Sequence, residues 1–412
     1  MRITIKVCIS ILLISFGNTL FAQQIFRPFP QHVIYADGVI IPNHITRWQM
    51  DDSVQNFYTN WKERYVNDDA GAGQYYIWTE NAVKKKICVS EGQGYGMIVV
   101  ALMAGYDTSA QKTYDGLFRY YKLHPSNKKS ILMAWAQNSS FKNIDETSAA
   151  DGDMDIAYSL LLASTQWGNT GNINYFDEAQ TLITAISKEE INHRTWSVLL
   201  SNSIEPDSKD YFDTRSSDFM PAHFKIFEEV TKDSTWCKVI GSNYTLFNFL
   251  QKKYSPDAGI FPDFIQQLNR LPVPAKPMYL ESKYDGCYNY NACRSPWRIA
   301  TDYIINGDCR SKKIVDKINT WIRETTQGNP DNISAGYTLQ GNDLKGRNFE
   351  AMSFISSFAV AAMVDKKNQD WLNKLWNYIT SFDIDQFDYY DNSIKMLELI
   401  ILSGNYWAPK IT

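Results

Sequence analysis

Three stretches of the sequence carry acidic residues in settings that suit acid–base chemistry. The first is VSEGQGYGM, residues 89–97, where Ser90 is expected to cap a helix that Glu91 opens. Each of the three glycines in this stretch costs a helix about 1 kcal/mol relative to alanine. We therefore expect another backbone, or a ligand, to approach this helix closely near Glu91. The alternative is that Glu91 only complements the helix dipole.

The second stretch places three aspartates at alternate positions, Asp151, Asp153 and Asp155, ahead of the apolar run IAYSLLLA. Alternate aspartates are typical of calcium loops, but this stretch has no glycine at the sixth place and no closing glutamate. One aspartate capping the following helix is the structural alternative. Three acids where one suffices favour a further role.

The third stretch, residues 279–308, combines acids, aromatic rings and arginines ahead of a helix. Its polar and aromatic residues include Glu281, Asp285, Tyr290, Arg294, Trp297 and Arg298. The whole chain is also rich in aromatic residues, with 12 Trp, 25 Tyr and 21 Phe. Most are expected in the core, but flat C–H faces of sugar rings stack on aromatic rings. The third stretch therefore suits a sugar-binding groove.

The elements that must position these residues are predicted to be helices. Apolar periodicity gives about twelve of them: 51–66, 91–106, 109–124, 153–168, 174–189, 217–232, 235–254, 294–306, 310–326, 347–365, 368–382 and 390–404. Strand-like alternation is scarce, and GQYYIWTE is its best case. Long connections alternate with short ones, which favours helical hairpins with their long loops on one functional face. Six hairpins predict an all-α (α/α)6 barrel, and a superhelical stack is the competing arrangement.

Composition and the N-terminus restrict the class of protein. Residues 1–22 have a basic start, a short apolar run and small residues before Gln23, which predicts a cleaved signal peptide. That apolar run is too short to insert in a membrane. We expect a periplasmic or secreted chain, residues 23–412, forming a single catalytic domain. A net charge of -4 spread along the chain argues against nucleic acid as a partner.

Cysteine and histidine spacing argues against a metal site. The five histidines are scattered, with no HExxH or CxxC pair, so zinc is not expected. The mature chain keeps an odd number of cysteines without regular spacing, which is not a disulfide framework. A single bridge among the last three and free buried thiols both stay open. The five are Cys88, Cys237, Cys287, Cys293 and Cys309.

Taken together, these stretches resemble glycoside hydrolase family 8, the family of bacterial endoglucanases, lichenases, chitosanases and some xylanases. SEGQGYGM and DGDMDIAYSLLLA carry the resemblance, and HPSNKKSILMAWAQ, TRSSDFMPAHF and YNACRSPWRIATDY are weaker family-like pieces. The resemblance implies an (α/α)6 barrel and hydrolysis with inversion. It implies that Glu91 is the general acid. The resemblance also implies that an aspartate of the second motif contacts the sugar at the cleavage point. Asp151 is the first candidate for this role and Asp153 the second.

The chain departs from the family pattern at three places. Ala150 stands where Ser or Thr is usual, and Phe219 where Trp is common. More important is Asn291, where many members carry an aspartate as general base, because an amide cannot accept a proton from water. A branch with chitosanases and lichenases, which uses a glutamate in the preceding loop, resembles the chain better. The resemblance then implies that Glu281 is the base, with Asp285 in reserve.

The expected substrate is a β-1,4-linked polysaccharide that is cut internally, either chitosan or mixed-linkage β-glucan and cellulose. Its expected binding residues, in addition to Asp153, are Tyr95, Trp135, Tyr290, Asn291 and Arg294. Paired carboxyl groups need neither metal nor organic cofactor, and a groove that admits a polymer favours a monomer. The alternatives are a xylan-active hydrolase of the same family, a non-catalytic carbohydrate-binding barrel, and a polysaccharide lyase.

Overall fold

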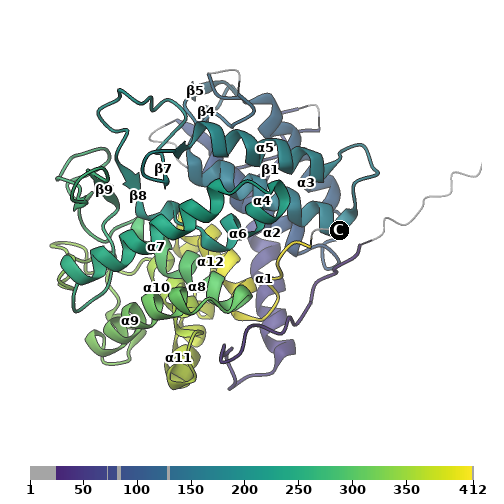
Figure 1. Ribbon diagram of the computed structural model, residues 1–412. Coiled ribbons are helices and arrows are strands. Elements are labelled where there is room, and N and C mark those ends of the chain that lie inside the picture. Colours follow the sequence, from purple (N-terminus) through teal and green to yellow (C-terminus); the bar gives the residue numbers. More distant parts are fainter. Residues whose placement is uncertain (1–24, 72, 81–84, 128–129, 411–412) are drawn as a thin grey trace, which may run out of the picture.

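The computed structural model describes residues 25–71, 73–80, 85–127 and 130–410. The expected signal peptide, residues 1–22, lies outside the described residues. Within them the chain forms twelve α-helices and ten short strands (Figure 1). None of the described helices is both long and apolar enough to cross a membrane.

The α-helices in chain order are α1 (Arg47–Tyr65), α2 (Ser90–Leu102), α3 (Ala110–Leu123), α4 (Ala150–Trp167), α5 (Tyr175–Glu189), α6 (Pro221–Thr231), α7 (Thr235–Lys253), α8 (Ser295–Asn306), α9 (Cys309–Thr325), α10 (Met352–Ala362), α11 (Gln369–Thr380) and α12 (Tyr389–Leu402). The strands are β1 (Val66–Asn67), β2 (Tyr76–Ile77), β3 (Lys86–Val89), β4 (Ala136–Asn138), β5 (Asn143–Asp145), β6 (Ile191–Asn192), β7 (Ser197–Val198), β8 (Thr214–Arg215), β9 (Phe264–Gln266) and β10 (Val273–Pro274).

The helices alternate between an inner ring and an outer layer. In the inner ring α2 contacts α4, α4 contacts α6, and the series continues through α8 and α10 to α12, which contacts α2. Each outer helix packs against an inner one: α1 on α12, α3 on α2, α5 on α4, α7 on α6, α9 on α8 and α11 on α10. Because the last inner helix contacts the first, the ring is closed. The predicted (α/α)6 barrel is confirmed, and the superhelical stack is excluded.

Sequence explains which helices lie inside. All eleven residues of α10, MSFISSFAVAA, are buried, as expected of a helix that is apolar on every side. In outer helix α9 the buried residues are Ser311, Ile314, Val315, Ile318, Asn319 and Ile322. Their spacing of three and four residues gives one buried stripe and one solvent face.

The predicted helices all exist, and their boundaries differ most at the N-terminal ends. Helix α4 begins at Ala150, three residues before the prediction, whereas α6 begins later, at Pro221. The expectation that Ser90 caps α2 is wrong. Val89 holds the cap position, and Ser90 is the first helical residue. The reason is that β3 pairs with β4 up to Val89 and the Ser90 N–H still donates to the Trp135 carbonyl at 2.9 Å.

The long connections lead into the inner helices and the short ones lead out of them. Antiparallel pairing in the orders β3–β4–β5 and β10–β9–β8 orders the loops before α2, α4, α6 and α8. By contrast, only residues 232–234 join α6 to α7, and only residues 307–308 join α8 to α9. The long loops therefore gather at the N-terminal ends of the inner helices, as predicted.

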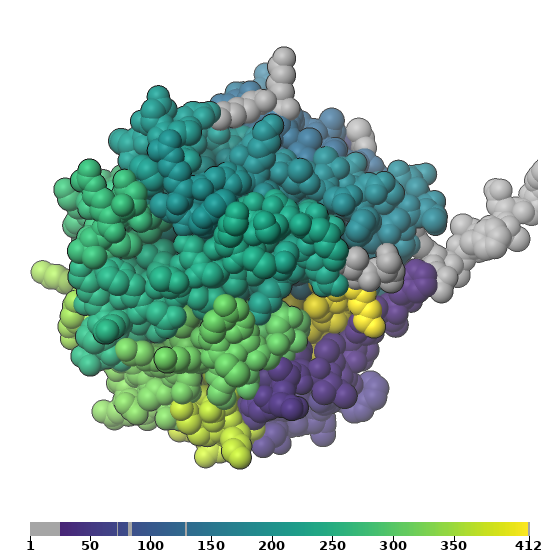
Figure 2. All heavy atoms as spheres, viewed as in Figure 1, coloured from purple at the N-terminus to yellow at the C-terminus, as the bar shows by residue number. Residues whose placement is uncertain are grey.

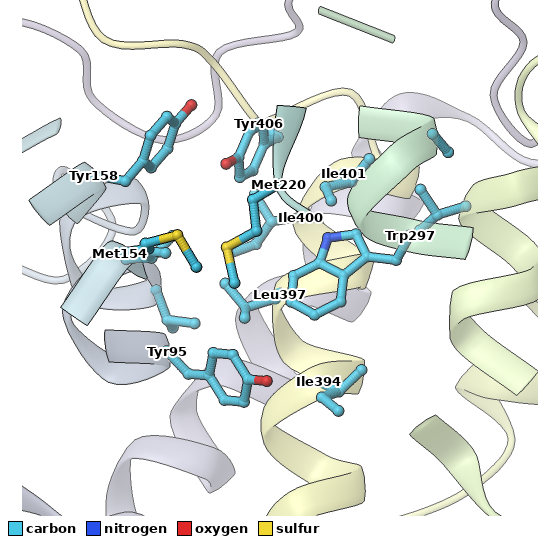
Figure 3. Close-up of a cluster of buried hydrophobic side chains, with 14 of the residues drawn as sticks. Tyr95, Met154, Tyr158, Met220, Trp297, Ile394, Leu397, Ile400, Ile401 and Tyr406 are labelled. Carbon is cyan, nitrogen blue, oxygen red and sulfur yellow. The ribbon is translucent and has the colours of Figure 1, made fainter. Parts of the chain in front are cut away.

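The centre of the barrel is filled by side chains. Figure 3 shows Tyr95 of α2, Met154 of α4, Trp297 of α8 and Leu397 of α12 directed toward a common centre. All four are at most 4% exposed. The barrel interior is therefore a packed core, and a binding site has to lie at one of its ends.

The two ends of the described chain lie together. The Val33 N–H donates to the Gly404 carbonyl at 2.7 Å, and the Gln31 N–H donates to Asn405 Oδ1 at 2.8 Å. Figure 2 shows the purple N-terminal segment beside the yellow C-terminal one. The five cysteines among the described residues, Cys88, Cys237, Cys287, Cys293 and Cys309, are all free thiols.

Candidate active site

A cavity of about 810 Å³ lies where the loops meet the N-terminal ends of the inner helices. Six carboxyl groups line it: Glu91, Asp145, Asp151, Asp210, Glu281 and Asp388. Among the described residues that line the cavity, the cationic ones are Arg215 and Arg294. The positive ends of helices α2, α4 and α12 favour carboxylates at this place.

Two glycines bring Glu91 and Asp151 together by allowing α2 and α4 to pack closely. A Cβ on Gly152 would lie 2.6 Å from the Ser90 side chain and 2.7 Å from the Glu91 nitrogen. A Cβ on Gly94 would lie 2.7 Å from the Asp155 Cβ. Gly94 therefore serves the approach of another backbone, one of the two expected reasons, whereas a Cβ on Gly92 or Gly96 would meet the side chain of Tyr389 or Ile77.

Arg294 joins the two acids. Its Nη1 donates to Glu91 Oε2 at 2.5 Å and to Asp151 Oδ2 at 2.7 Å, while Tyr95 Oη lies at 3.1 Å. Its Nη2 donates to Ser217 Oγ at 2.9 Å. Arg294 is 2% exposed, so this cation is held by its hydrogen bonds among buried partners.

The surroundings separate the pKa values of Glu91 and Asp151. Burial raises the pKa of Glu91 to about 7; the charge of Arg294 opposes this and that of Asp151 adds to it. Burial also acts to raise the pKa of Asp151, but the charges of Arg294 and Arg215 outweigh it and lower the pKa to about 2. The two neighbouring carboxyl groups thus differ in pKa, an arrangement that suits a proton donor beside a permanent anion.

Glu281 lies on an exposed loop tip that still lines the cavity. The tip is held by Asp285, whose Oδ2 accepts from the Leu280 N–H at 2.7 Å and the Glu281 N–H at 3.0 Å. Asp285 Oδ1 accepts from the Ser282 N–H at 2.7 Å. The reserve base candidate Asp285 is thus buried, is bonded to its own loop, and is absent from the cavity lining.

Asn291 stands between the arginine and the loop carboxylate. Its Oδ1 accepts from Arg294 Nη2 at 3.1 Å, and its Nδ2 donates to Glu281 Oε2 at 2.8 Å. Behind it, buried Asp263 Oδ1 accepts from the Ala292 N–H at 2.7 Å and fixes the turn. Burial raises the pKa of Asp263 to about 7.

The other expected binding residues divide into two groups. Trp135 and Tyr290 line the cavity, and the Lys86 ammonium lies 3.4 Å from the centre of the Trp135 ring. Tyr95 and Asp153 are fully buried and absent from the lining. Tyr95 lies beneath Arg294, and Asp153 Oδ1 accepts from the Met133 N–H at 2.8 Å.

Several residues of the site are absent from the sequence-based candidates. Arg215 lines the cavity and lies 3.6 Å from Asp151 Oδ1 and 3.7 Å from Asp218 Oδ1. Ser217, between them in sequence, accepts from Arg294. The available signal was the piece TRSSDF, which puts an arginine, two hydroxyls and an aspartate immediately before a helix. Among the described residues there is no group of three or more His, Cys, Asp or Glu arranged to hold a metal ion.

Comparison with known proteins identifies relatives over most of the chain. Residues 38–404 match the sequence profile of the glycosyl hydrolases family 8. The chain is 43% identical over 402 residues to a beta-glucanase of Niallia circulans, covering 97% of this chain and 96% of that protein. It is 39% identical over 394 residues to an endoglucanase of Bacillus sp. (strain KSM-330), covering 93% and 82%. It is 43% identical to the solved apo beta-1,3-1,4-glucanase of Paenibacillus sp. X4, with a TM-score of 0.89 and coverage of 93% and 99%.

Proposed function

Because the chain belongs to glycosyl hydrolases family 8 and is therefore a glycoside hydrolase, we propose that it is an endo-acting β-glucanase that cuts with inversion. The substrate class rests on the β-glucanase and endoglucanase relatives. The observation that carries the mechanism is the pair Glu91 and Asp151, with pKa values of about 7 and about 2, in one cavity with Glu281.

In this mechanism Glu91 is the general acid. A neutral Glu91 carries its proton on Oε1, because Oε2 accepts a hydrogen bond from Arg294. That proton passes to the oxygen of the leaving sugar as the glycosidic bond breaks. Asp151 stays ionised and holds the hydroxyls of the sugar at the cleavage point. Its charge also keeps Glu91 protonated near neutral pH.

Glu281 is the general base. It removes a proton from a water molecule that attacks the anomeric carbon from the opposite side of the sugar. Inversion requires the acid and the base to stand about 6.5–9.5 Å apart, so that this water fits between sugar and base. The exposed loop tip of Glu281 gives water access, and Trp135 and Tyr290 offer ring faces for neighbouring sugars.

The catalytic assignment is tested with Glu91→Gln and Glu281→Gln. Each is expected to lower kcat on mixed-linkage β-glucan at least about 100-fold, the usual contribution of a general acid or base. Glu178→Gln, at a surface ion pair with Lys122, is the matched control and keeps wild-type turnover. Proton NMR of the first product is expected to show the α-anomer. Wild-type turnover in either site variant removes that residue from the mechanism.

Chitosan is the second candidate substrate. Six cavity carboxyl groups against two guanidinium groups favour a polymer that carries amino groups. We expect mixed-linkage β-glucan to be cut fastest in a panel that also contains carboxymethylcellulose, chitosan and xylan. A higher kcat/KM on chitosan would reassign the acidic lining to recognition of the amino group, and a higher value on xylan would reject both glucan and chitosan.

We also propose export of the chain through cleavage after Ala22. This rests on the basic and apolar pattern of residues 1–22. N-terminal sequencing of protein recovered from the medium or periplasm of a bacterial host is expected to begin at Gln23. Recovery of an intact Met1 terminus outside the cytoplasm would contradict it.

A further inference from the structure

The amide of Asn291 lies between two groups of opposite charge. Arg294 Nη2 donates to its oxygen at 3.1 Å, and its nitrogen donates to Glu281 Oε2 at 2.8 Å. Asn291 is 7% exposed, so water does not substitute readily for either partner. Only one orientation of the amide satisfies both contacts. If it were flipped, two donors would face each other at Arg294 and two acceptors at Glu281.

The same arginine holds the other side of the site. Arg294 Nη1 donates to Glu91 and Asp151 while Nη2 donates to Asn291. A continuous chain of hydrogen bonds therefore connects Glu91 to Glu281 through one guanidinium and one amide. A hydrogen bond received from a cation polarises the amide and strengthens its own donation.

Both backbone segments that carry this contact are fixed from behind. Asp263 accepts from the Asn289 N–H at 3.1 Å and the Ala292 N–H at 2.7 Å, on the two sides of Asn291. Asp285 holds the loop tip of Glu281. The Glu281 side chain itself, on an exposed residue, accepts a hydrogen bond from Asn291 Nδ2 at 2.8 Å. The amide is therefore placed to decide where that carboxylate points.

We propose that Asn291 is a positioning residue that orients the Glu281 carboxylate toward the attacking water and couples its place to that of Glu91. This inference rests on the proposed function, since it needs Glu281 as the base. A carboxylate at position 291 could accept from Arg294 but could not donate to Glu281. The amide thus matches a site whose base lies on the neighbouring loop.

The test is Asn291→Leu, which keeps the side chain's size and removes both hydrogen bonds. We expect kcat on mixed-linkage β-glucan to fall about 10-fold or more, as small misplacements of a catalytic group do. KM is expected to stay within about twofold, because the other expected sugar-binding side chains, such as Trp135 and Tyr290, are unchanged. Asn373→Leu, which breaks an exposed amide contact with Asn43, is the matched control with unchanged kcat.

Repeating the substitution Asn291→Leu in the Glu281→Ala variant shows whether Asn291 acts through Glu281. In Glu281→Ala, added azide attacks the anomeric carbon in place of water and needs no base. The new C–N bond forms as the C–O bond breaks, and Glu91 protonates the leaving oxygen. We expect Asn291→Leu to change this azide-supported rate by less than about twofold, since effects through one group are not additive.

The outcomes separate the two proposals. If Glu281→Ala hydrolyses at the wild-type rate, the base assignment falls and takes this inference with it. If Glu281→Ala is inactive in water but Asn291→Leu lowers the azide rate as much as the water rate, only this inference falls. A crystal structure of Asn291→Leu provides an independent readout: the Glu281 carboxylate leaves its place, and an unmoved carboxylate overturns the inference.

Discussion

At the scale of single residues, one guanidinium organises the site. Arg294 was expected to bind the substrate; it lines the cavity and also binds Glu91, Asp151 and the amide of Asn291. Its charge opposes protonation of Glu91, so a protonated acid at neutral pH needs burial and the charge of Asp151 together. If Glu91 is the acid, as proposed, the balance of these three effects on its pKa sets the pH range of activity.

The pH profile is expected to report that balance. As the proposed general acid, Glu91 must be protonated to act, so kcat/KM is expected to fall as the pH rises through about 7, the pKa of Glu91. Asp151→Asn removes a charge that raises this pKa and leaves Arg294 less neutralised. Both effects lower the pKa of Glu91, so the basic limb of kcat/KM moves to lower pH. A basic limb that stays in place or moves up would contradict this reading.

The sequence predicted the residues of the site better than their contacts. Glu91, Asp151 and Glu281 lie in one cavity because each stands at or before the start of an inner helix, where a motif is readable. Arg215 was missed because one of its partners, Asp151, comes from a distant segment, and only Asp218 lies in the same stretch of sequence. Contacts between distant segments depend on the ring of helices, which no local spacing encodes.

At the scale of elements, the three alternate aspartates show how a helix boundary changes a prediction. Because α4 begins at Ala150, residues two apart point about 200° away from each other. Asp151 reaches the cavity, Asp153 meets the Met133 N–H, and Asp155 pairs with Arg298. Only the first of them lines the site. An extended loop would have kept all three on one face.

The close packing of α2 and α4 is testable at Gly152. In Gly152→Ala the new methyl group meets the backbone at Ser90 and Glu91, which has no flexible atom to move. We expect a loss of about 1–3 kcal/mol in unfolding free energy from overpacking, and a fall in kcat as Glu91 shifts. Gly171→Ala, with nothing within 4 Å of the added carbon, is the control. Urea unfolding and steady-state kinetics measure the two effects. Equal unfolding free energies and equal kcat values for Gly152→Ala and Gly171→Ala would contradict the prediction.

Glu190, the C-cap residue that follows α5, predicts how stability depends on pH. Burial raises the pKa of Glu190 to about 8, and Ser148 Oγ donates to its Oε1 at 2.5 Å. The folded state therefore holds a proton that the unfolded state has released above about pH 4.3. The stabilisation is fully present below that pH and is lost as the pH rises through about 8.

Glu190→Gln replaces the acid by a side chain that never ionises. Its melting temperature is expected to exceed that of the wild type most at pH 8–9, and the difference should shrink as the pH falls toward 4. Calorimetry at several pH values measures this. A difference that grows toward acid would mean that Glu190 is ionised in the folded protein.

At the scale of the whole molecule, ring closure makes the first and last helices depend on each other. Helix α12 packs against both α1 and α2, and Trp61 Nε1 of α1 donates to Ser393 Oγ of α12 at 3.1 Å. Helix count and loop alternation predicted a ring, but the inner and outer layers became visible only through contacts. Which helix is buried on all sides depends on tertiary packing, so periodicity alone leaves it open.

Removal of α12 is expected to unfold the protein rather than leave a stable stack of the other eleven helices. A chain ending at Asp388 leaves the facing sides of α2 and α10 without a partner, so we expect dye binding to exposed apolar surface and no cooperative thermal transition. A chain ending at Pro409 keeps α12 and serves as the control. A sharp melting transition in the Asp388 chain would show that the remaining helices form a stable open stack.

The contact of α12 with α1 and α2 also determines the order in which parts of the protein can fold. Residues 332 positions apart, such as Trp61 and Ser393, must find each other before the ring closes, and such distant pairings slow folding because a long loop has to be closed first. During synthesis the apolar flank of α2 stays uncovered until α12, which begins only at Tyr389 of the 412-residue chain, has emerged. Until then the nascent protein exposes apolar surface to which a chaperone could bind. Folding of the ring therefore finishes only after translation is complete, and the N-terminal half does not fold first as a separate unit.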